Sequence, residues 1–479
     1  MAKMFIHGEY VDSTSNEWDE IRNPATGEVV DRVPRGNRQD ARAAIEAALT
    51  AFPAWADLPF SHRGELLFRA ANLIKSQEKE LATLLTQEQG KPLRESIREI
   101  RRFVHTIEHY AGLAKNVRGG YIPNLDKGKY GKIIKKPIGV CGAIVPWNFP
   151  VALMGNKIGP GLLAGNTFVV KPAGTTPLTA IRCIELFHQA GLPRGVLNIV
   201  TGPGGEVGQE IIDHPKVRKI GFTGSTETGK RVMEHAAREL KKVTLELGGS
   251  DPMIVCDDAD IDRAVSAASV GRFYNCGQAC LAVKRLYLFD TIADEFIEKL
   301  IEKVKKLRVG NGLEEGTMLG PLHTAYQREE IEAQLDEAVS RGARVLVGGR
   351  RPEGQEYEKG HFFLPTLVTD VPEDARLLRE EVFGPVLPIV RVKDFEEAIE
   401  KANDSIYGLG SSIWTCSLKR AEEAAERLEA GYTWVNSAQI IYDELPFGGV
   451  KYSGMGKEHG YEALDYYMET KAVVIAPGI

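Results

Sequence analysis

The stretch GVCGAIVPWNFP at residues 139–150 opens the part of the chain that decides the fold. Its apolar, β-branched run leads into a proline-bounded loop, as expected for a buried strand that ends in a tight turn. Helical stretches such as LTAIRCIELFHQAG separate several of the similar runs that follow, which are NTFVVKPA at 166–173, VLNIVTG at 196–202, KIGFTG at 219–224 and VTLELGG at 243–249. This alternation predicts a parallel, doubly wound α/β sheet.

The alternation begins again after residue 250 and predicts a second α/β domain. Its strand-like runs include PMIVC at 252–256, LYLF at 286–289, PVLPIVRV at 385–392 and YTWVNS at 432–437. Ligands of parallel α/β sheets bind beyond the carboxyl ends of the strands. In the first domain those ends carry Asn148, Lys171, Gly202, Ser225 and Glu246. We therefore expect the reaction centre in the cleft between the two domains.

A segment of the second domain, FYNCGQACLAVKR at 273–285, contains a candidate nucleophile, Cys280. Most cysteines are small buried hydrophobes, so this role depends on partners elsewhere in the chain. Gly277 lets the backbone turn tightly before Cys280. Glu246 supplies a carboxylate at one strand end, and Asn148 supplies an amide at another. A thiol, a carboxylate and an amide suit acyl chemistry, as nucleophile, base and oxyanion donor.

Six motifs, in this order and spacing, closely resemble those of the aldehyde dehydrogenase superfamily. They are VPWNFP at 145–150, FTGSTETG at 222–229, LELGG at 245–249, NCGQAC at 275–280, EEVFGPV at 380–386 and PFGGVKYSG at 446–454. The resemblance covers essentially the whole chain. It implies oxidation of an aldehyde to the carboxylic acid with reduction of NAD or NADP.

The resemblance also implies a mechanism. The Cys280 thiolate attacks the aldehyde, and Asn148 and the Cys280 backbone N–H stabilise the oxyanion of the thiohemiacetal. The thioester left after hydride transfer is hydrolysed by a water that Glu246 activates, and Lys157 supports the site. Relatives that pass the acyl group to coenzyme A lack the Glu246 carboxylate, so its presence favours hydrolysis. Cys276 is expected to pack, with a protective oxidised state as an alternative.

The domains implied by the resemblance are a dinucleotide-binding domain at 1–117 and 139–248 and a catalytic domain at 249–448. Residues 118–138 and 461–479 form an oligomerisation arm. The turn formers in LDKGKYG predict a β-hairpin at 118–138. In the family such an arm joins a C-terminal strand in a sheet that bridges subunits. We expect a homotetramer or a dimer.

Two glycine-rich stretches are candidates for binding the cofactor. FTGSTETG follows a strand and opens a helix, so free amides there can hold a phosphate, and the resemblance assigns this role to Gly224, Ser225 and Gly229. GPGGEVG at 202–208 misses the dinucleotide fingerprint by one residue, and a simple glycine loop is an equal interpretation. Further cofactor contacts implied by the resemblance are Val145, Pro146, Trp147, Lys171, Gly174, Gly204, Gly208, Phe222, Leu247, Glu381 and Phe383.

The choice between NAD and NADP depends on one position. In the family Lys171 reaches the adenosine ribose, and three residues on many NAD-preferring members carry a glutamate that binds both ribose hydroxyls. This chain has Gly174 there, which removes a carboxylate that would repel a 2′-phosphate. Our hypothesis is that NADP is accepted, with a slight lean towards it over NAD.

The substrate tunnel is expected to include Asn156, Tyr274, Ile441 and Tyr442. Asn156 stands eight residues after Asn148, where the family often has tryptophan, and a polar side chain there favours a small or hydroxylated aldehyde. A dedicated semialdehyde, lactaldehyde or glyceraldehyde dehydrogenase is an alternative. A non-catalytic protein on the same scaffold is a remote alternative, disfavoured by the intact catalytic residues.

Composition bounds these interpretations. The 479 residues carry a net charge of −6, which argues against nucleic acid and anionic membranes as partners. The six cysteines show no CxxC spacing, so a reduced, cytoplasmic protein without a metal site is expected. One helix is predicted from about residue 66 to the stop signal at Gly90-Lys91-Pro92, and another over 93–116.

Overall fold

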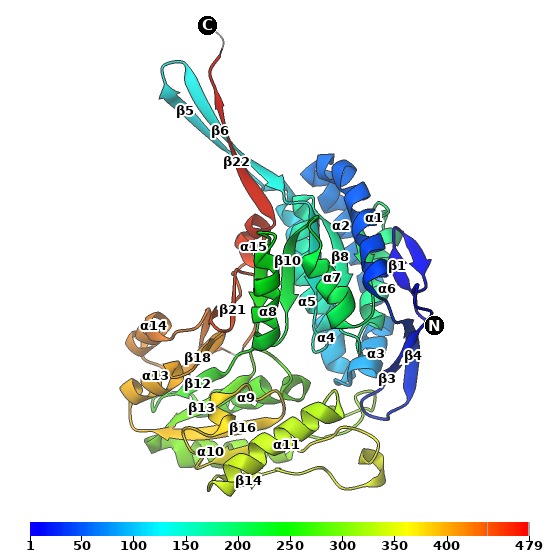
Figure 1. The fold of residues 1–479 in the computed structure, drawn as a ribbon. Helices are drawn as coiled ribbons and strands as arrows, with labels where there is room; N and C mark the ends of the chain where they lie inside the picture. Colours follow the sequence, from blue (N-terminus) through cyan, green and yellow to red (C-terminus); the bar gives the residue numbers. More distant parts are fainter. Residues whose placement is uncertain (438, 478–479) are drawn as a thin grey trace.

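The computed structural model describes residues 1–437 and 439–477. Figure 1 shows two α/β domains, and a narrow arm that projects from the first domain on the side away from the second. The predicted fold class is confirmed, because each domain is built on a mainly parallel sheet. Among the described residues, no helix has both the length and the apolar character needed to cross a bilayer.

The sheet of the first domain has eight strands within the described part of the chain. Its central strands run parallel, and antiparallel strands close both edges. The strands are, in sheet order, β2 (Glu9–Val11), β1 (Met4–Ile6), β9 (Leu197–Ile199), β8 (Thr167–Lys171), β7 (Val140–Ile144), β10 (Val217–Thr223), β11 (Lys242–Glu246) and β21 (Gly454–Met455).

Helices cover both faces of this sheet, because successive strand residues point to opposite sides. Phe168 and Val170 of β8 pack into one hydrophobic cluster, whereas Val169 between them packs into another. The first cluster includes α2 (Phe60–Ser76), α3 (Glu78–Gln89), α4 (Leu93–Gly112), α5 (Pro150–Ala164) and α6 (Leu178–Gln189). The second includes α1 (Arg38–Asp57), α7 (Gln209–Asp213) and α8 (Thr226–Ala237). The sheet is therefore doubly wound.

The second domain has a seven-stranded sheet among the described residues. Its strands are, in order, β14 (Arg344–Val347), β15 (Thr366–Thr369), β16 (Val386–Val392), β13 (Val283–Phe289), β12 (Asp251–Val255), β18 (Gly410–Trp414) and β19 (Tyr432–Val435). Its larger helices are α9 (Ile261–Phe273), α10 (Asp290–Lys305), α11 (Ala325–Ser340), α13 (Phe395–Asn403) and α14 (Leu418–Arg427). They enclose a separate apolar core.

A short linker joins the two sheets. Strand β11 ends at Glu246 and β12 begins at Asp251. The linker is held by Ser453, whose carbonyl accepts from the Leu247 amide at 3.0 Å and whose hydroxyl donates to the Gly248 carbonyl at 2.7 Å. The smaller elements are β3 (Trp18–Arg22), β4 (Val29–Pro34), α12 (Arg376–Arg379), β17 (Tyr407–Gly408), β20 (Val450–Lys451) and α15 (Gly460–Tyr466).

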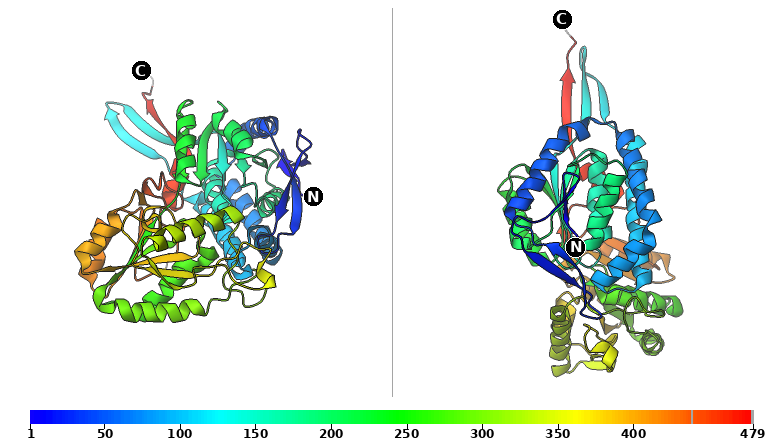
Figure 2. Two further views of the ribbon diagram at one scale, coloured as in Figure 1. Left: turned by 60° about the horizontal axis from the view of Figure 1, so that its bottom comes forward. Right: turned by 90° about the vertical axis from the view of Figure 1, so that its right-hand side faces the viewer.

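The arm is a three-stranded antiparallel sheet of β5 (Gly120–Asp126), β6 (Lys129–Pro137) and β22 (Met468–Ile475). The predicted hairpin is present, and Figure 2 shows the arm extending well beyond the body of the molecule. Strand β22 pairs with β6 of its own chain along its full length. The C-terminal strand thus completes the arm within one subunit.

The prediction of a single helix up to Gly90 is wrong in one respect, because the helix is broken at Gln77, between α2 and α3. The backbone there leaves helical geometry, and the Gln77 amide donates back to the carbonyls of Ile74 and Lys75. Apolar periodicity missed the break because Ile74 before it and Leu81 after it enter the same core. The predicted stop is confirmed at Gly90, which takes a left-handed φ of 102°.

Close contact between α4 and α5 depends on glycine. A Cβ added at Gly155 would lie 2.6 Å from the ring of Phe103. We expect Gly155→Ala to destabilise the protein by about 1–3 kcal/mol through overpacking. Gly112→Ala is the matched control, because a Cβ there meets nothing within 4 Å. Thermal unfolding checks both variants, and equal melting temperatures would contradict the expectation.

Candidate active site

A cavity of about 260 Å³ lies where the first sheet meets the second domain. Both domains supply its walls, including the linker after β11 and one side of α11. Ten of the residues predicted from the sequence line it: Pro146, Trp147, Asn148, Gly224, Ser225, Glu246, Leu247, Cys280, Glu381 and Phe383. The structure therefore brings together the candidate nucleophile, base and oxyanion donor.

Cys280 follows an unusual turn. Asn275, Cys276 and Gly277 have φ of 50°, 56° and 73°, so the chain reverses through left-handed conformations. Such geometry is strained for residues other than glycine and needs outside support. The Glu95 carboxylate of α4 accepts from the Asn275 backbone N–H at 2.8 Å. The Gln89 side chain of α3 donates to the Asn275 side-chain oxygen at 3.1 Å. The first domain thus holds the turn that presents Cys280.

Gly277 and Cys276 have clear structural roles in this turn. A Cβ at Gly277 would lie 2.3 Å from the Gly384 carbonyl, so glycine is required by close approach as well as by φ. Cys276 is buried and packs in the core of the second domain, as predicted.

Asn148 lies between β7 and α5, and its side-chain amide donates to the Gln278 carbonyl at 3.1 Å. Its own carbonyl accepts from Lys91 Nζ at 2.6 Å and from the Asn275 side chain at 3.0 Å. Lys91 is completely buried and pairs with the buried carboxylate of Glu99 at 2.6 Å. The Asn148 amide is therefore held beside the cysteine loop before any substrate arrives.

Glu246 ends β11 and is buried. Neither of its oxygens has a hydrogen-bond partner of good geometry among the described residues. Burial, with the nearby Glu458 carboxylate, raises the pKa of Glu246 to about 8. Burial and the facing Glu246 likewise raise the pKa of the Cys280 thiol well above its usual range. Both shifts favour the neutral forms of the two groups.

Lys157 does not reach the cavity. Its ammonium is buried and donates to Glu458 at 2.7 Å and to the Thr223 hydroxyl at 2.6 Å. Asn156 is also buried and donates to the other Glu458 oxygen at 2.9 Å. Lys157 is therefore buried beside the cavity rather than on its wall, and Asn156 likewise has a structural partner outside the cavity lining.

The cofactor candidates fall into two groups. Ser225 caps α8 by accepting from the Thr228 amide at 3.3 Å, and Gly224 beside it lines the cavity. A Cβ at Gly229 would lie 2.4 Å from Leu247, so this glycine lets the linker approach α8. Trp147 stacks on His323 at 4.6 Å and meets the edge of Phe383 at 5.6 Å. Trp147, Gly224, Ser225 and Phe383 line the same cavity. They combine a helix N-terminus with aromatic faces, which suits a dinucleotide.

The second group lies outside this cavity lining. Lys171 ends β8, and burial lowers its pKa to about 8. A Cβ at Gly208 would lie 3.5 Å from its side chain, so these two residues are neighbours. Gly204–Gly208 form a single π-helical turn before α7, and Gly174 is exposed with open space where a Cβ would stand. Val145 and Phe222 are buried beneath this end of the sheet.

The remaining substrate candidates also lie outside the cavity lining. Tyr274 stacks on Phe149 at 6.0 Å, and Lys91 Nζ lies 4.0 Å from the centre of the Phe149 ring. Ile441 is half-buried and Tyr442 is exposed. The neighbouring Asp443 is completely buried and accepts from Arg102, Thr106 and His459. This loop is thus anchored to α4.

Sequence analysis missed the residues that hold the site in place. Glu95 and Glu99 were predicted only as part of the helix over 93–116, and Gln89 and Lys91 only as part of the preceding helix and its stop signal. Glu458 falls just after the last motif and was not singled out. The available signal was position, since Gln89 and Lys91 flank the glycine where α3 ends.

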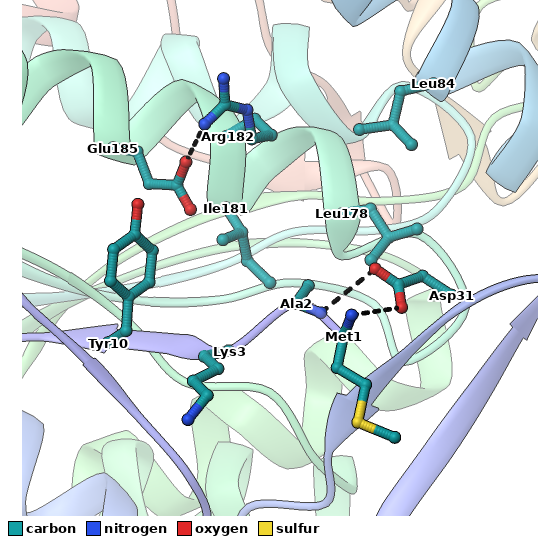
Figure 3. Close-up of a pocket in the computed structure, with 10 residues that line it drawn as sticks. All are labelled: Met1, Ala2, Lys3, Tyr10, Asp31, Leu84, Leu178, Ile181, Arg182 and Glu185. Atoms are coloured by element: carbon teal, nitrogen blue, oxygen red, sulfur yellow. Dashed lines mark hydrogen bonds and ion pairs between the residues drawn. The ribbon is translucent and has the colours of Figure 1, made fainter.

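A larger surface cavity of about 560 Å³ lies elsewhere, beneath the N-terminal strands (Figure 3). Its charged groups are paired, with Arg182 bonded to Glu185 and the N-terminal amine to Asp31. No predicted site residue lines it. The chemistry therefore belongs to the smaller cavity between the domains.

Comparison with known proteins agrees with this site. The profile of the aldehyde dehydrogenase family matches residues 10–473. The chain is 44% identical over 472 residues to the glutarate-semialdehyde dehydrogenase of Pseudomonas putida, covering 98% of this chain and 97% of the relative. It is 43% identical over 470 residues to the Escherichia coli succinate-semialdehyde dehydrogenase [NADP(+)] GabD, with 98% and 97% coverage.

A solved structure extends the comparison to three dimensions. The betaine aldehyde dehydrogenase of Staphylococcus aureus in complex with NAD+ superposes with a TM-score of 0.97 at 37% identity, covering 100% of this chain and 95% of that one. The predicted family, enzyme class and use of NAD(P) are confirmed. This chain belongs to the aldehyde dehydrogenase family and is an NAD(P)-dependent enzyme that oxidises an aldehyde to the carboxylic acid.

Proposed function

We propose that this aldehyde dehydrogenase is hydrolytic, with Cys280 as nucleophile, Asn148 as oxyanion donor and Glu246 as the base for water. The observation that supports this most directly is one cavity lined by all three side chains. We also propose the division into a dinucleotide-binding domain at 1–117 and 139–248, a catalytic domain at 249–448 and an arm at 118–138 and 461–479.

In this mechanism the Cys280 thiol first releases its proton to solvent. The thiolate sulfur then bonds to the aldehyde carbon, and the carbonyl oxygen becomes an oxyanion. The Asn148 amide, already oriented by the Gln278 carbonyl, and the Cys280 backbone N–H donate to that oxygen. NAD(P), when bound along Trp147, Gly224, Ser225 and Phe383, supplies the hydride acceptor. Loss of hydride from the thiohemiacetal re-forms the C=O bond and leaves a thioester on Cys280. Glu246 then takes a proton from water, which attacks the thioester and releases the carboxylic acid and the Cys280 thiolate.

The protonation state of Glu246 decides whether the thioester can be hydrolysed. A carboxylic acid with a pKa of about 8 is mostly protonated at pH 7 and cannot act as a base. Hydrolysis should therefore accelerate as pH rises through about 8. Buried Lys157 and Asn156 share Glu458, whose negative charge raises the pKa of Glu246. We propose that Lys157 supports the site by opposing that charge, because its ammonium lowers the pKa of Glu246.

We propose that the substrate is a small or polar aldehyde. The names of the semialdehyde dehydrogenases that this chain resembles favour a semialdehyde as the narrower alternative. Lactaldehyde, glyceraldehyde and the tunnel roles of Asn156, Tyr274 and Ile441 remain predictions. Comparable turnover of long alkanals and small polar aldehydes would contradict the proposal.

We further propose that the arm mediates a homodimer or homotetramer. It exposes apolar side chains on β5 and β22, namely Tyr121, Ile122, Leu125 and Val474. Its outer edges carry unpaired backbone groups, which favour pairing with another chain. Because β22 completes the arm within its own chain, another subunit would meet a preformed sheet.

A cytoplasmic location of the protein also remains a prediction.

Turnover tests the catalytic assignment. With an aldehyde panel and NAD or NADP, we expect wild-type protein to raise absorbance at 340 nm and Cys280→Ala to abolish the signal. Asn148→Ala should lower kcat by about 10²–10³, since one oxyanion donor is lost. Cys416→Ala is the control, because Cys416 is exposed and distant in sequence from the site, and it should retain full activity. Activity in Cys280→Ala would refute the nucleophile.

Alkylation tests the coupling between Cys280 and Glu246. Removing the facing carboxylate relieves repulsion of the thiolate, so Glu246→Gln should shift the pH midpoint of Cys280 alkylation by iodoacetamide to lower pH. Mass spectrometry of the Cys280 peptide measures the rate without any aldehyde. A shift to higher pH would instead mean that Glu246 deprotonates the thiol.

The cofactor hypothesis is tested at Gly174. A glutamate fits there, since the Cβ position is open. We expect Gly174→Glu to lower kcat/KM for NADP at least tenfold relative to NAD by repelling the 2′-phosphate, with Gly174→Gln as the neutral control of the same size. In the wild type, NAD favoured more than tenfold would overturn the lean towards NADP.

A further inference from the structure

Lys284 is a buried cation at the point where three active-site segments meet. Its side chain has 0% exposure. Its Nζ lies 2.9 Å from the Cys280 carbonyl oxygen, 3.0 Å from the Gly249 carbonyl oxygen and 2.8 Å from Glu381 Oε1. An ammonium has three protons to donate, so all of them are used. The lysine thus joins the nucleophile segment, the linker after Glu246 and the loop that carries Glu381.

The contact fixes one oxygen of Glu381. The same Oε1 also accepts from the Gly249 amide at 3.1 Å. The Glu381 side chain is 20% exposed and lines the cavity, so its carboxylate faces the proposed cofactor wall. A Cβ at Gly248 would lie 2.4 Å from Oε2, so the carboxylate sits directly over the linker backbone. Lys284 therefore sets the orientation in which Glu381 meets a ligand.

The lysine also acts on the nucleophile through its charge. Three charged side chains bear most directly on the Cys280 thiol, and two of them, Glu246 and Glu381, disfavour the thiolate. Lys284 is the cation that opposes them. Its charge favours the thiolate and so offsets part of the rise in the pKa of Cys280. The buried lysines nearby are engaged elsewhere, Lys157 with Glu458 and Lys91 with Glu99.

Burial alone does not imply this role. Lys219 of β10 is equally buried, donates to the Thr244 hydroxyl at 2.7 Å and lines no part of the cavity. It provides a lysine of matched burial that contacts neither Cys280 nor Glu381.

We propose that Lys284 is a positioning residue that couples cofactor binding to nucleophile reactivity, by fixing Glu381 for contact with a cofactor ribose and by holding positive charge beside Cys280. The inference rests on the proposed function of this site. Lys284 lies outside the proposed catalytic trio, and it would act both in cofactor binding and in activation of the nucleophile.

The test compares Lys284→Met, Lys284→Arg and Lys219→Met. Iodoacetamide labelling of Cys280 against pH and NAD or NADP titration by protein fluorescence are both measured without aldehyde. Lys284→Met should raise the labelling midpoint by roughly one pH unit and weaken cofactor binding about tenfold. Lys284→Arg keeps the charge and should restore the midpoint, whereas Lys219→Met should change neither quantity.

A lower melting temperature for Lys284→Met with unchanged midpoint and cofactor affinity would overturn the proposal in favour of a structural role. If Lys284→Met does not fold, Glu381→Gln takes its place in the test. Cofactor binding should then weaken and the pH midpoint of Cys280 labelling should fall. No change in either quantity would also overturn the proposal. Failure of the proposed function is separate, since it would appear as absent aldehyde-dependent absorbance in the wild type.

Discussion

The proposed reaction centre depends on two sheets that are held in a fixed relation. Glu246 and Asn148 come from the first domain, whereas Cys280 comes from the second. The contacts between the Asn275 turn and helices α3 and α4 maintain this relation. Since a misplacement of about 1 Å can cost two orders of magnitude in rate, this junction matters as much as the catalytic side chains.

Buried charge accompanies this arrangement. Lys91 with Glu99, Lys157 with Glu458, and Lys284 with Glu381 are ion pairs whose lysines are buried around the site. Buried pairs contribute little net stability, because desolvation offsets their attraction, but removing one partner is costly. Glu246 has no such partner among the described residues, and burial, with the charge of Glu458, raises its pKa. Paired buried charges and an unpaired buried acid thus lie side by side in the site.

The sequence predicted the parts of this structure that depend on local pattern. Apolar runs located the strands of both sheets, and Asn148, Glu246 and Cys280 were found because loops at strand ends carry chemistry. The support for these residues was not predictable in the same way. Glu95 and Lys91 belong to a charged helix and its preceding loop. Only the folded chain shows that Glu95 is buried against the cysteine turn and Lys91 against the Asn148 carbonyl. The break at Gln77 was hidden because apolar periodicity continues across it.

The short linker between β11 and β12 limits how the molecule can move. Few residues separate Glu246 from Asp251, and Ser453 clamps two of them. A hinge needs backbone that is free to change its dihedral angles. A clamshell opening about this segment would break those bonds and separate Glu246, the proposed base, from Cys280, the proposed nucleophile. We therefore expect the two domains to stay together while ligands enter and leave.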